Sequence, residues 1–241
     1  FYKACRAGSI LGTMQAGYTD FKFLSDVSKK IFAREALIGV SITGWMNNPD
    51  VLFDKKVLEK GAKIVKEVNR EVAALLGINP AARTTCVKPS GNASVLLQTA
   101  SGIHAEHSTM YIRNVQMTKD SEVTQAIQKA NPYMVEDSVW SATNSDVVVS
   151  FPIIPKKGSY VKEDLIGVDH LEKVKLVQQH WVNAGTNEEL CADKGVRHNV
   201  SNTILVDDWH EVEKYVFKNR HSFAGISFLS MMGDKDFNQA P

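Results

Sequence analysis

The chain has 241 residues, of which 44% are hydrophobic and 23% charged, a balance typical of a globular protein with one large domain or two small ones. Lys and Arg number 28 and Asp and Glu 27, so the net charge of +1 gives no electrostatic case for direct binding to DNA or to an acidic membrane surface. No apolar run approaches the roughly 18 residues that a membrane span needs, and no signal peptide is recognisable.

The cysteines and the chain ends add to these limits. Cys5, Cys86 and Cys191 lie far apart and form no Cys-x-x-Cys pair, which argues against a disulfide framework and a structural zinc site. We therefore expect a reducing, cytoplasmic location and no metal centre. The chain starts at Phe1 rather than Met and stops at Pro241 without a tail-like composition. We expect a piece of a longer polypeptide, although an artificial boundary gives the same pattern.

The first third of the chain is predicted to be helical. Residues 7–24 predict a helix or a loop followed by a helix. Apolar residues at roughly helical spacing predict a helix over 27–42, with Gly44 as its stop and a turn at 47–50. The clearest helix spans 58–76, where apolar residues recur at steps of three and four until Gly77.

Strands and helices alternate in the remainder. Strands are predicted over 84–87, 111–117 and 147–151, the last buried on both faces and ended by Pro152, with a helix over 121–130 between the second and third. A helix over 164–183, a polar loop over 187–197, a strand over 200–206, a helix capped by Asp207 or Asp208, and a strand over 223–229 follow. This order predicts an α/β fold with a largely parallel sheet or barrel, and places residues 1–241 in one domain or part of one.

The most informative stretch is residues 83–104, RTTCVKPSGNASVLLQTASGIH. A strand, a Gly/Ser turn and a helix start together collect anions, because free backbone N–H groups and the helix dipole favour negative charge at a helix N-terminus. The functional interpretation is a phosphate cradle. Its predicted members are Ser90, Gly91, Asn92, Ala93 and Ser94. The alternative is an ordinary strand-to-helix turn, because the stretch matches neither a P-loop nor a dinucleotide fingerprint.

Several blocks of sequence together resemble one family. VKPSGNASVLL, SGIHAEHS and YIRNV look like the substrate-phosphate loop region of adenosylcobalamin-dependent (class II) ribonucleotide reductases. REALIGVSITG upstream, and HNVSNTILVDDW, FAGISFL and the terminal NQAP downstream, follow in the family's order. Lys-Pro-Ser-Gly followed by Gly-Ile-His is most similar to the monomeric ribonucleoside-triphosphate reductase type. Asn92-Ala93 departs from the more usual Thr-Val or Thr-Leu, a change that a backbone cradle tolerates.

The resemblance implies the later half of a ten-stranded α/β barrel and reduction of a ribonucleotide at its 2′ carbon. In that chemistry adenosylcobalamin initiates a cysteine thiyl radical, a glutamate acts on the 3′ hydroxyl, and a cysteine pair supplies electrons that come from a thioredoxin-type reductant. A deoxyribonucleotide effector is a further expected ligand. The family carries its thiyl cysteine in an Asn-x-Cys-x-Glu pattern, which none of the three cysteines here matches. We therefore expect no catalytic residue within 1–241, only the phosphate cradle and part of the barrel wall.

Two other interpretations stay open: a class I large subunit, and a non-catalytic nucleotide-binding α/β module. Pro89, His104, His198 and Asn199 are candidate lining residues of the site. Loop hydrogen bonding is favoured over metal ligation for His104 and His107, whereas His198 is equally consistent with a structural turn.

Four further side chains carry structural expectations. Trp181 and Trp209 are predicted to lie in the core because both fall on helical apolar stripes. Arg34 and Glu35 are predicted to form an exposed helical pair that contributes little.

Overall fold

The computed structural model describes residues 1–91 and 93–231. Its helices are α1 (Tyr2–Ala16), α2 (Asp26–Glu35), α3 (Pro49–Leu52), α4 (Lys55–Leu76), α5 (Ala93–Leu96), α6 (Glu122–Ala130), α7 (Gly167–Val177) and α8 (Trp209–Asn219). Its strands are β1 (Val40–Ser41), β2 (Thr85–Cys86), β3 (Tyr111–Thr118), β4 (Val135–Asp137), β5 (Asp146–Ile153), β6 (Ile204–Val206) and β7 (Phe228–Ser230). A π-helical turn, η4 (Gln178–Asn183), continues α7, and short 3-10 turns include η1 (Trp45–Asn47) and η5 (Glu188–Leu190).

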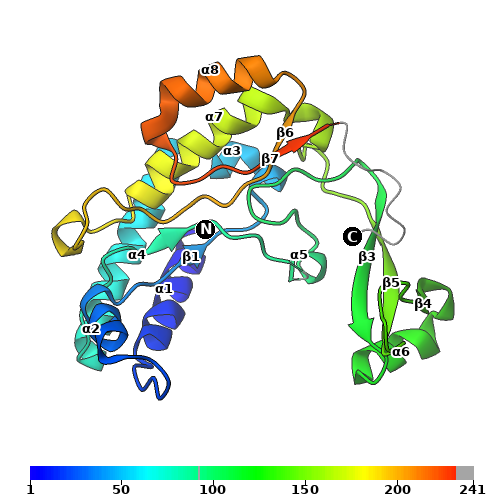
Figure 1. The fold of residues 1–241 in the computed structure, drawn as a ribbon, viewed down its shortest axis with the longest axis horizontal. Coiled ribbons are helices and arrows are strands. Elements are labelled where there is room, and N and C mark those ends of the chain that lie inside the picture. The colour runs from blue at the N-terminus through cyan, green and yellow to red at the C-terminus, as the bar shows by residue number, and fades with distance from the viewer. Residues whose placement is uncertain (92, 232–241) are drawn as a thin grey trace.

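A set of parallel extended segments forms the body of the molecule (Figure 1). β1 pairs with β2, and β6 pairs with β7, both in parallel. Val87, directly after β2, forms a parallel bridge with Val200, four residues before β6 begins. The four segments therefore follow one another in the order β1, β2, 199–206 and β7, and all run in the same direction.

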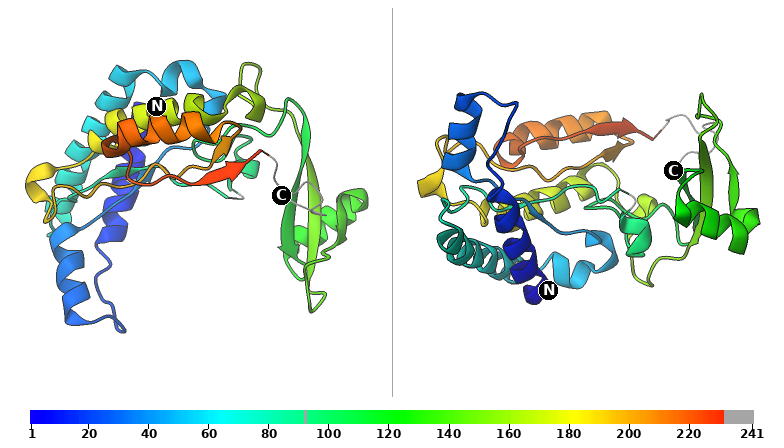
Figure 2. Two further views of the ribbon diagram at one scale, coloured as in Figure 1. Left: turned by 45° about the horizontal axis from the view of Figure 1, so that its top comes forward. Right: turned by 90° about the horizontal axis from the view of Figure 1, so that it is seen from below.

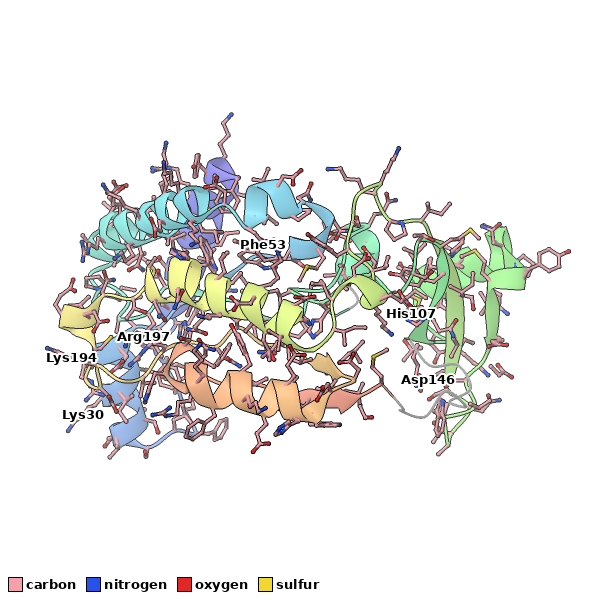
Figure 3. All side chains as sticks on the ribbon, turned by 90° about the horizontal axis from the view of Figure 1, so that it is seen from above. Lys30, Phe53, His107, Asp146, Lys194 and Arg197 are labelled. Atoms are coloured by element: carbon pink, nitrogen blue, oxygen red, sulfur yellow. The ribbon has the colours of Figure 1, made fainter. Side chains whose placement is uncertain are left out.

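Helices cover one face of these strands. α4, α7 and α8 lie side by side as a layer (Figure 3). The core between helices and strands is built from fully or almost fully buried apolar side chains: Trp45, Leu58, Val65, Val87, Leu171, Val174, Val177, Trp181, Val200, Ile204, Val206 and Val212. Burying each such side chain is worth about 1.5–3 kcal/mol, so this packing holds strands that have few ladder hydrogen bonds of their own.

The other face of the parallel strands is open. Along 200–206 the even-numbered residues are buried against the helices and the odd-numbered residues are only half-buried. The same alternation occurs at Thr85, Cys86, Val87 and Lys88, where Cys86 and Lys88 lie on the open side. Parallel sheets are normally covered on both faces. The open face is therefore the unusual surface of this fold.

A second, antiparallel sheet lies at one end of the long axis, beyond the carboxyl ends of the parallel strands (Figure 2). Its order is β3-β5-β4. The predicted strand over 147–151 is its centre, and Val147, Val148 and Val149 are all buried, as expected for a strand covered on both faces. Pro152 does not end β5, because it lies past the residues that pair with β4 and is flanked by β3 alone.

The structure confirms most predicted elements and corrects others. α4, α6, β3 and α7 with its η4 extension are confirmed, and Asp208 caps α8 by accepting hydrogen bonds from the backbone N–H groups of His210 and Glu211. The sheet is not largely parallel, because β3, β5 and β4 pair antiparallel. The strand predicted over 200–206 is regular only over β6, and the last strand is β7 rather than 223–229.

The helix predicted over 27–42 is wrong beyond Glu35. α2 ends there because Ala36 takes a left-handed conformation, with φ of 42°. Ile38 and Val40 then donate backbone hydrogen bonds to the carbonyls of Arg83 and Thr84. Pairing with the β2 segment thus outweighs the helical preference of these residues.

Two side-chain predictions fail as well. Trp181 is buried as predicted, but Trp209 is 52% exposed on α8. Arg34 and Glu35 are not an exposed pair: Glu35 is buried and accepts a hydrogen bond of 2.8 Å from the buried Arg83 guanidinium. Burial opposes ionisation of Glu35, but hydrogen bonds from Arg34 and Arg83 outweigh it and hold the pKa of the carboxyl below its ordinary value.

Candidate functional site

The candidate site is the loop 88–104, which follows β2 directly. Ligands of open α/β sheets bind outside the carboxyl ends of the parallel strands, which is where this loop emerges. The loop holds the single helical turn α5 and lies on the side of the body that faces the antiparallel sheet (Figure 1). No acidic residue occurs between Arg83 and Ala105. Position and charge therefore suit an anionic ligand.

Gly91 forms the turn at the start of the loop. Its φ of +55° is one that side chains rarely tolerate, and a Cβ placed there would meet nothing within 4 Å. The Ser94 hydroxyl, fully buried, donates 2.7 Å to the Gly91 carbonyl, and the Ser94 N–H donates to the same oxygen at 3.3 Å. Ser94 thus closes the turn from inside, and the space over Gly91 stays open. Asn92, the third predicted cradle residue, lies outside the described residues.

Ser90 also holds the loop together. Its N–H donates 2.9 Å to the Ser101 hydroxyl, and its own hydroxyl accepts a hydrogen bond of 3.0 Å from Thr43. Ala93 donates its N–H to the Ser90 carbonyl at 3.2 Å and is exposed. In this structure Ser90 and Ser94 therefore shape the turn, and the open approach for a ligand lies over Gly91.

The far end of the loop is closed by Gly102. Its φ is +56°, and an added Cβ would lie 3.0 Å from the Lys88 carbonyl oxygen, so glycine is needed where the chain passes back along residues 88–89. The Thr43 hydroxyl oxygen accepts the Gly102 N–H at 2.9 Å, and its single proton is shared between the Ser90 hydroxyl and the Ala100 carbonyl, each 3.0 Å away. The loop is thus closed on itself and anchored to the segment that follows β1.

The predicted lining residues separate into two hollows on the open face. His198 and Asn199 line one of about 460 Å³ together with Cys86 and Lys88. The His198 ring donates from Nδ1 to the Thr85 carbonyl at 3.1 Å, and burial lowers the pKa of this imidazole. His198 therefore serves as both a structural contact and a lining residue. Pro89 is exposed at the start of the loop.

His104 lines the other hollow, of about 140 Å³, with His170 and Lys162. Its Nδ1 donates 3.0 Å to the Ser101 carbonyl, and the exposed His107 accepts a hydrogen bond of 2.7 Å from Lys162. Figure 3 shows His107 where the helical body meets the antiparallel sheet. Both histidines make the loop hydrogen bonds that the sequence favoured. Within residues 1–91 and 93–231 no cluster of three His, Cys, Asp or Glu side chains is arranged to hold a metal ion.

Two neighbours of the loop were missed by the sequence analysis. Arg113 on β3 donates 3.1 Å to the Ser94 hydroxyl, and Asn47 in η1 accepts hydrogen bonds from Thr99 and Ala100. The only signal for Arg113 was its place in the YIRNV block, and Asn47 lay in a predicted turn. Both contacts join distant parts of the chain, so no local pattern reveals them.

The chain is similar to proteins of known activity. The chain is 26% identical over 220 residues to the adenosylcobalamin-dependent ribonucleoside-triphosphate reductase of Euglena gracilis, which covers 89% of this chain and 28% of that protein. It is 29% identical over 161 residues to a probable reductase of the same name from Dictyostelium discoideum, covering 65% of this chain and 21% of the relative. No family model matches the chain.

A crystal structure of a B12-dependent (class II) ribonucleotide reductase superposes with a TM-score of 0.74 over 98% of this chain and 35% of that one, at 18% identity. The resemblance to class II ribonucleotide reductases is confirmed. This reductase-like chain shares the fold of the corresponding part of that enzyme. It spans about a quarter of the length of the curated relatives it matches. Among the described helices, none combines the length and apolarity needed to cross a membrane.

Proposed function

We propose that the chain is the substrate-phosphate-binding part of an adenosylcobalamin-dependent ribonucleotide reductase. The observation that carries the proposal is the open approach over Gly91, in a loop without acidic residues at the carboxyl end of β2. The N–H groups of Ser90, Ala93 and Ser94 are used within the loop, so the phosphates approach from the open side of Gly91, where the backbone has no side chain in the way. The names of the relatives support a ribonucleoside triphosphate as the substrate.

We further propose that the open face of the parallel strands is the inner wall of the reductase barrel. The alternation of buried and half-buried residues along 200–206 supports this, because a wall needs one face toward helices and one toward the lumen. His198, Asn199 and Lys88 then point toward the reacting nucleotide, while the phosphates lie over Gly91. A thioredoxin-type reductant and a deoxyribonucleotide effector remain predictions for the whole reductase.

Adenosylcobalamin is the cofactor in the relatives' names, and when bound it supplies the radical that starts the reaction. The two hollows on the open face, of about 460 and 140 Å³, do not enclose a group as large as a corrin ring with its axial ligands. Neither of these two hollows therefore fits the whole cofactor. None of the described residues is assigned to the cofactor.

The decisive test is calorimetric titration of the chain with a ribonucleoside triphosphate, and with inorganic tripolyphosphate as competitor. Gly91→Asn places a side chain in the open approach, and Asn tolerates the left-handed conformation better than most residues. Gly77→Asn is the matched control, because Gly77 has φ of +68° and equally open surroundings at the end of α4.

We expect the parent chain and Gly77→Asn to bind alike, with tripolyphosphate competing. Gly91→Asn should bind about tenfold more weakly, the equivalent of losing one charge-assisted hydrogen bond. Equal binding by Gly91→Asn would remove the loop as the phosphate site. Absence of any nucleotide binding would contradict the proposed function of this chain.

A further inference from the structure

The N-terminal part of the loop 88–104 is held by a residue that lies outside the loop. Arg113, on β3 of the antiparallel sheet, donates from Nη1 to the Ser94 hydroxyl at 3.1 Å. The same Ser94 hydroxyl donates to the Gly91 carbonyl at 2.7 Å, so Ser94 links Arg113 to the Gly91 turn. A guanidinium that donates to a hydroxyl makes that hydroxyl a stronger donor in turn. Arg113 therefore strengthens the contact that sets the Gly91 turn.

The other end of the loop is held by Asn47. This side chain is 5% exposed, and its Oδ1 accepts hydrogen bonds of 2.7 Å from both the Thr99 hydroxyl and the Ala100 N–H. Its Nδ2 donates 2.6 Å to Oε1 of Glu106. The amide thus bridges the loop and a buried carboxylate that lies outside it.

Glu106 connects the two ends. It is 2% exposed, and its second oxygen accepts a hydrogen bond of 2.7 Å from the Tyr111 hydroxyl. Tyr111 is two residues from Arg113 on β3, and the Arg113 guanidinium lies 6.0 Å from the Tyr111 ring centroid. Burial, together with the bond to Glu106, raises the pKa of Tyr111 to about 12, so the phenol stays a donor at neutral pH.

The polarity of this chain of contacts allows one arrangement. The two oxygens of Glu106 accept from Asn47 and Tyr111, so Glu106 fixes the Asn47 NH2 group toward itself. The Asn47 carbonyl must then face Thr99 and Ala100, which both donate. Reversing the amide would set donors against donors at the loop and leave Glu106 facing an oxygen. Such networks are costly to break when buried, because unpaired groups stay away from water.

We infer that Asn47, Glu106, Tyr111 and Arg113 form a loop brace. These positioning residues hold the loop 88–104 in the conformation that receives the phosphates of a nucleotide. The inference rests on the proposed function and deepens it, because it makes nucleotide affinity depend on residues that do not touch the ligand. Tyr111 and Arg113 belong to β3. The antiparallel sheet therefore takes part in substrate binding through the brace.

The first test compares Tyr111→Phe with Tyr133→Phe in the full chain. Tyr133→Phe is the matched control, since Tyr133 is fully exposed at η2 (Pro132–Met134), between α6 and β4. Tyr111→Phe removes one donor to Glu106 and leaves the ring in place. We expect roughly fivefold weaker binding of tripolyphosphate and of a ribonucleoside triphosphate, and faster hydrogen exchange at the Ala100 amide. Tyr133→Phe should change neither quantity.

The second test separates charge from shape at Arg113. The Arg113→Gln side chain can still donate to the Ser94 hydroxyl but carries no charge, whereas Arg113→Lys keeps the charge. Lys129→Gln on α6 is the control, because it also removes one positive charge, from an exposed side chain. Nucleotide affinity should fall for Arg113→Gln, recover in part for Arg113→Lys and stay unchanged for Lys129→Gln. An equal loss for Lys129→Gln would mean a general charge effect and would overturn the brace.

Failure of the brace and failure of the proposed function give different results. Should the parent chain bind no nucleotide, the proposed function fails, and Ala100 exchange in Tyr111→Phe still tests whether the brace holds the loop. If exchange rises while nucleotide affinity is unchanged, the contacts are merely structural and the inference is overturned. Unchanged exchange together with unchanged affinity overturns it too.

Discussion

The two sheets of this molecule are built by opposite means. The parallel strands pair over only two or three residues each, and a layer of helices holds them in place. The antiparallel sheet has an eight-residue ladder between β3 and β5 and a single nine-residue helix, α6, close in sequence. The antiparallel sheet thus has the more regular hydrogen bonding, and the parallel strands have the deeper burial. The proposed phosphate-binding loop emerges from the weakly paired but deeply packed parallel strands.

One ion pair from each part of the molecule shows a further contrast. In the parallel body, Arg83 and Glu35 are both more than nine-tenths buried and 2.8 Å apart. In the antiparallel sheet, Lys119 and Asp137 are also 2.8 Å apart, but the aspartate side chain is 69% exposed. Burial, rather than distance, decides what such a pair is worth. Four substitutions test the difference between the parallel body and the antiparallel sheet.

The largest effect is expected for Arg83→Met. The change leaves the buried Glu35 carboxylate with the half-exposed Arg34 and a backbone hydrogen bond from Ala192, and it removes the Arg83 hydrogen bonds to the carbonyls of Val196 and Asp193. Breaking a buried pair costs about 3–5 kcal/mol, and we expect the lower end at neutral pH. Urea unfolding measures it. Because the pKa of Glu35 is depressed in the folded state, the stabilisation is present above the ordinary carboxyl pKa and is lost on acidification. A loss below 1 kcal/mol at pH 7 would mean that water reaches this pair.

His170→Gln should change how stability depends on pH. Burial lowers the pKa of His170 from 6.5 to about 4, so the unfolded chain binds the extra proton first as pH falls. This histidine therefore costs nothing above pH 6.5 and destabilises progressively between pH 6.5 and 4, by about 3 kcal/mol in total. Gln retains a donor for the Ile103 carbonyl. Thermal unfolding at pH 7 and pH 4.5 should show a smaller difference for the variant than for the parent. An identical difference would place the acid sensitivity elsewhere.

Val149→Ala tests whether the antiparallel sheet unfolds separately. Val149 is fully buried in the middle of β5, opposite Val115 and Val135. Truncation should cost about 2 kcal/mol through lost burial and a residual cavity. We expect faster hydrogen exchange in β3, β4 and β5 but not in α4. Val65→Ala, an equally buried site on α4, is the control and should loosen the body instead. Faster exchange throughout the chain in both variants would show one cooperative unit.

Lys119→Gln should have the smallest effect. It removes the exposed pair with Asp137 and weakens a contact to Asn144. Exposed pairs contribute about 0–1 kcal/mol and are screened by salt. Chemical unfolding at low and at 0.5 M salt should differ little from the parent. A loss as large as that of Arg83→Met would refute burial as the deciding factor.

Elements with a strong local signal were predictable from sequence. The steps of three and four in α4, the alternation in β3 and the Asp208 cap of α8 need no knowledge of the rest of the chain. α2 shows the limit. Residues 36–42 carry a helical apolar pattern, yet they pair with the segment 83–86 more than 40 positions away. Long-range pairing of this kind outweighs local preference and leaves no local mark.

The candidate site divides in the same way. The turn at Gly91 was predictable, because a glycine in such a turn allows a conformation that other residues disfavour. The need for glycine at Gly102 was not, because it depends on the close approach of residues 88–89. The roles of the loop serines were not, because Ser90 and Ser94 are occupied by Ser101, Thr43 and Arg113. Asn47 reaches the loop across 53 positions of sequence. These hydrogen-bond partners are set by how whole helices and strands are placed in the fold, which a local sequence pattern does not reveal.

The hydrogen bonds of two buried tryptophans give this chain built-in fluorescent reporters. The Trp181 indole N–H donates 3.0 Å to the carbonyl of Cys86, the last residue of β2, and the Trp45 indole N–H donates 3.0 Å to the carbonyl of Ile42, directly after β1. Trp140 and Trp209 are more than half exposed, so iodide can quench their emission selectively. The remaining blue-shifted emission then comes from Trp45 and Trp181, which contact the segments leading into the loop. Ligand-induced movement there can be followed by emission spectroscopy without attaching a dye.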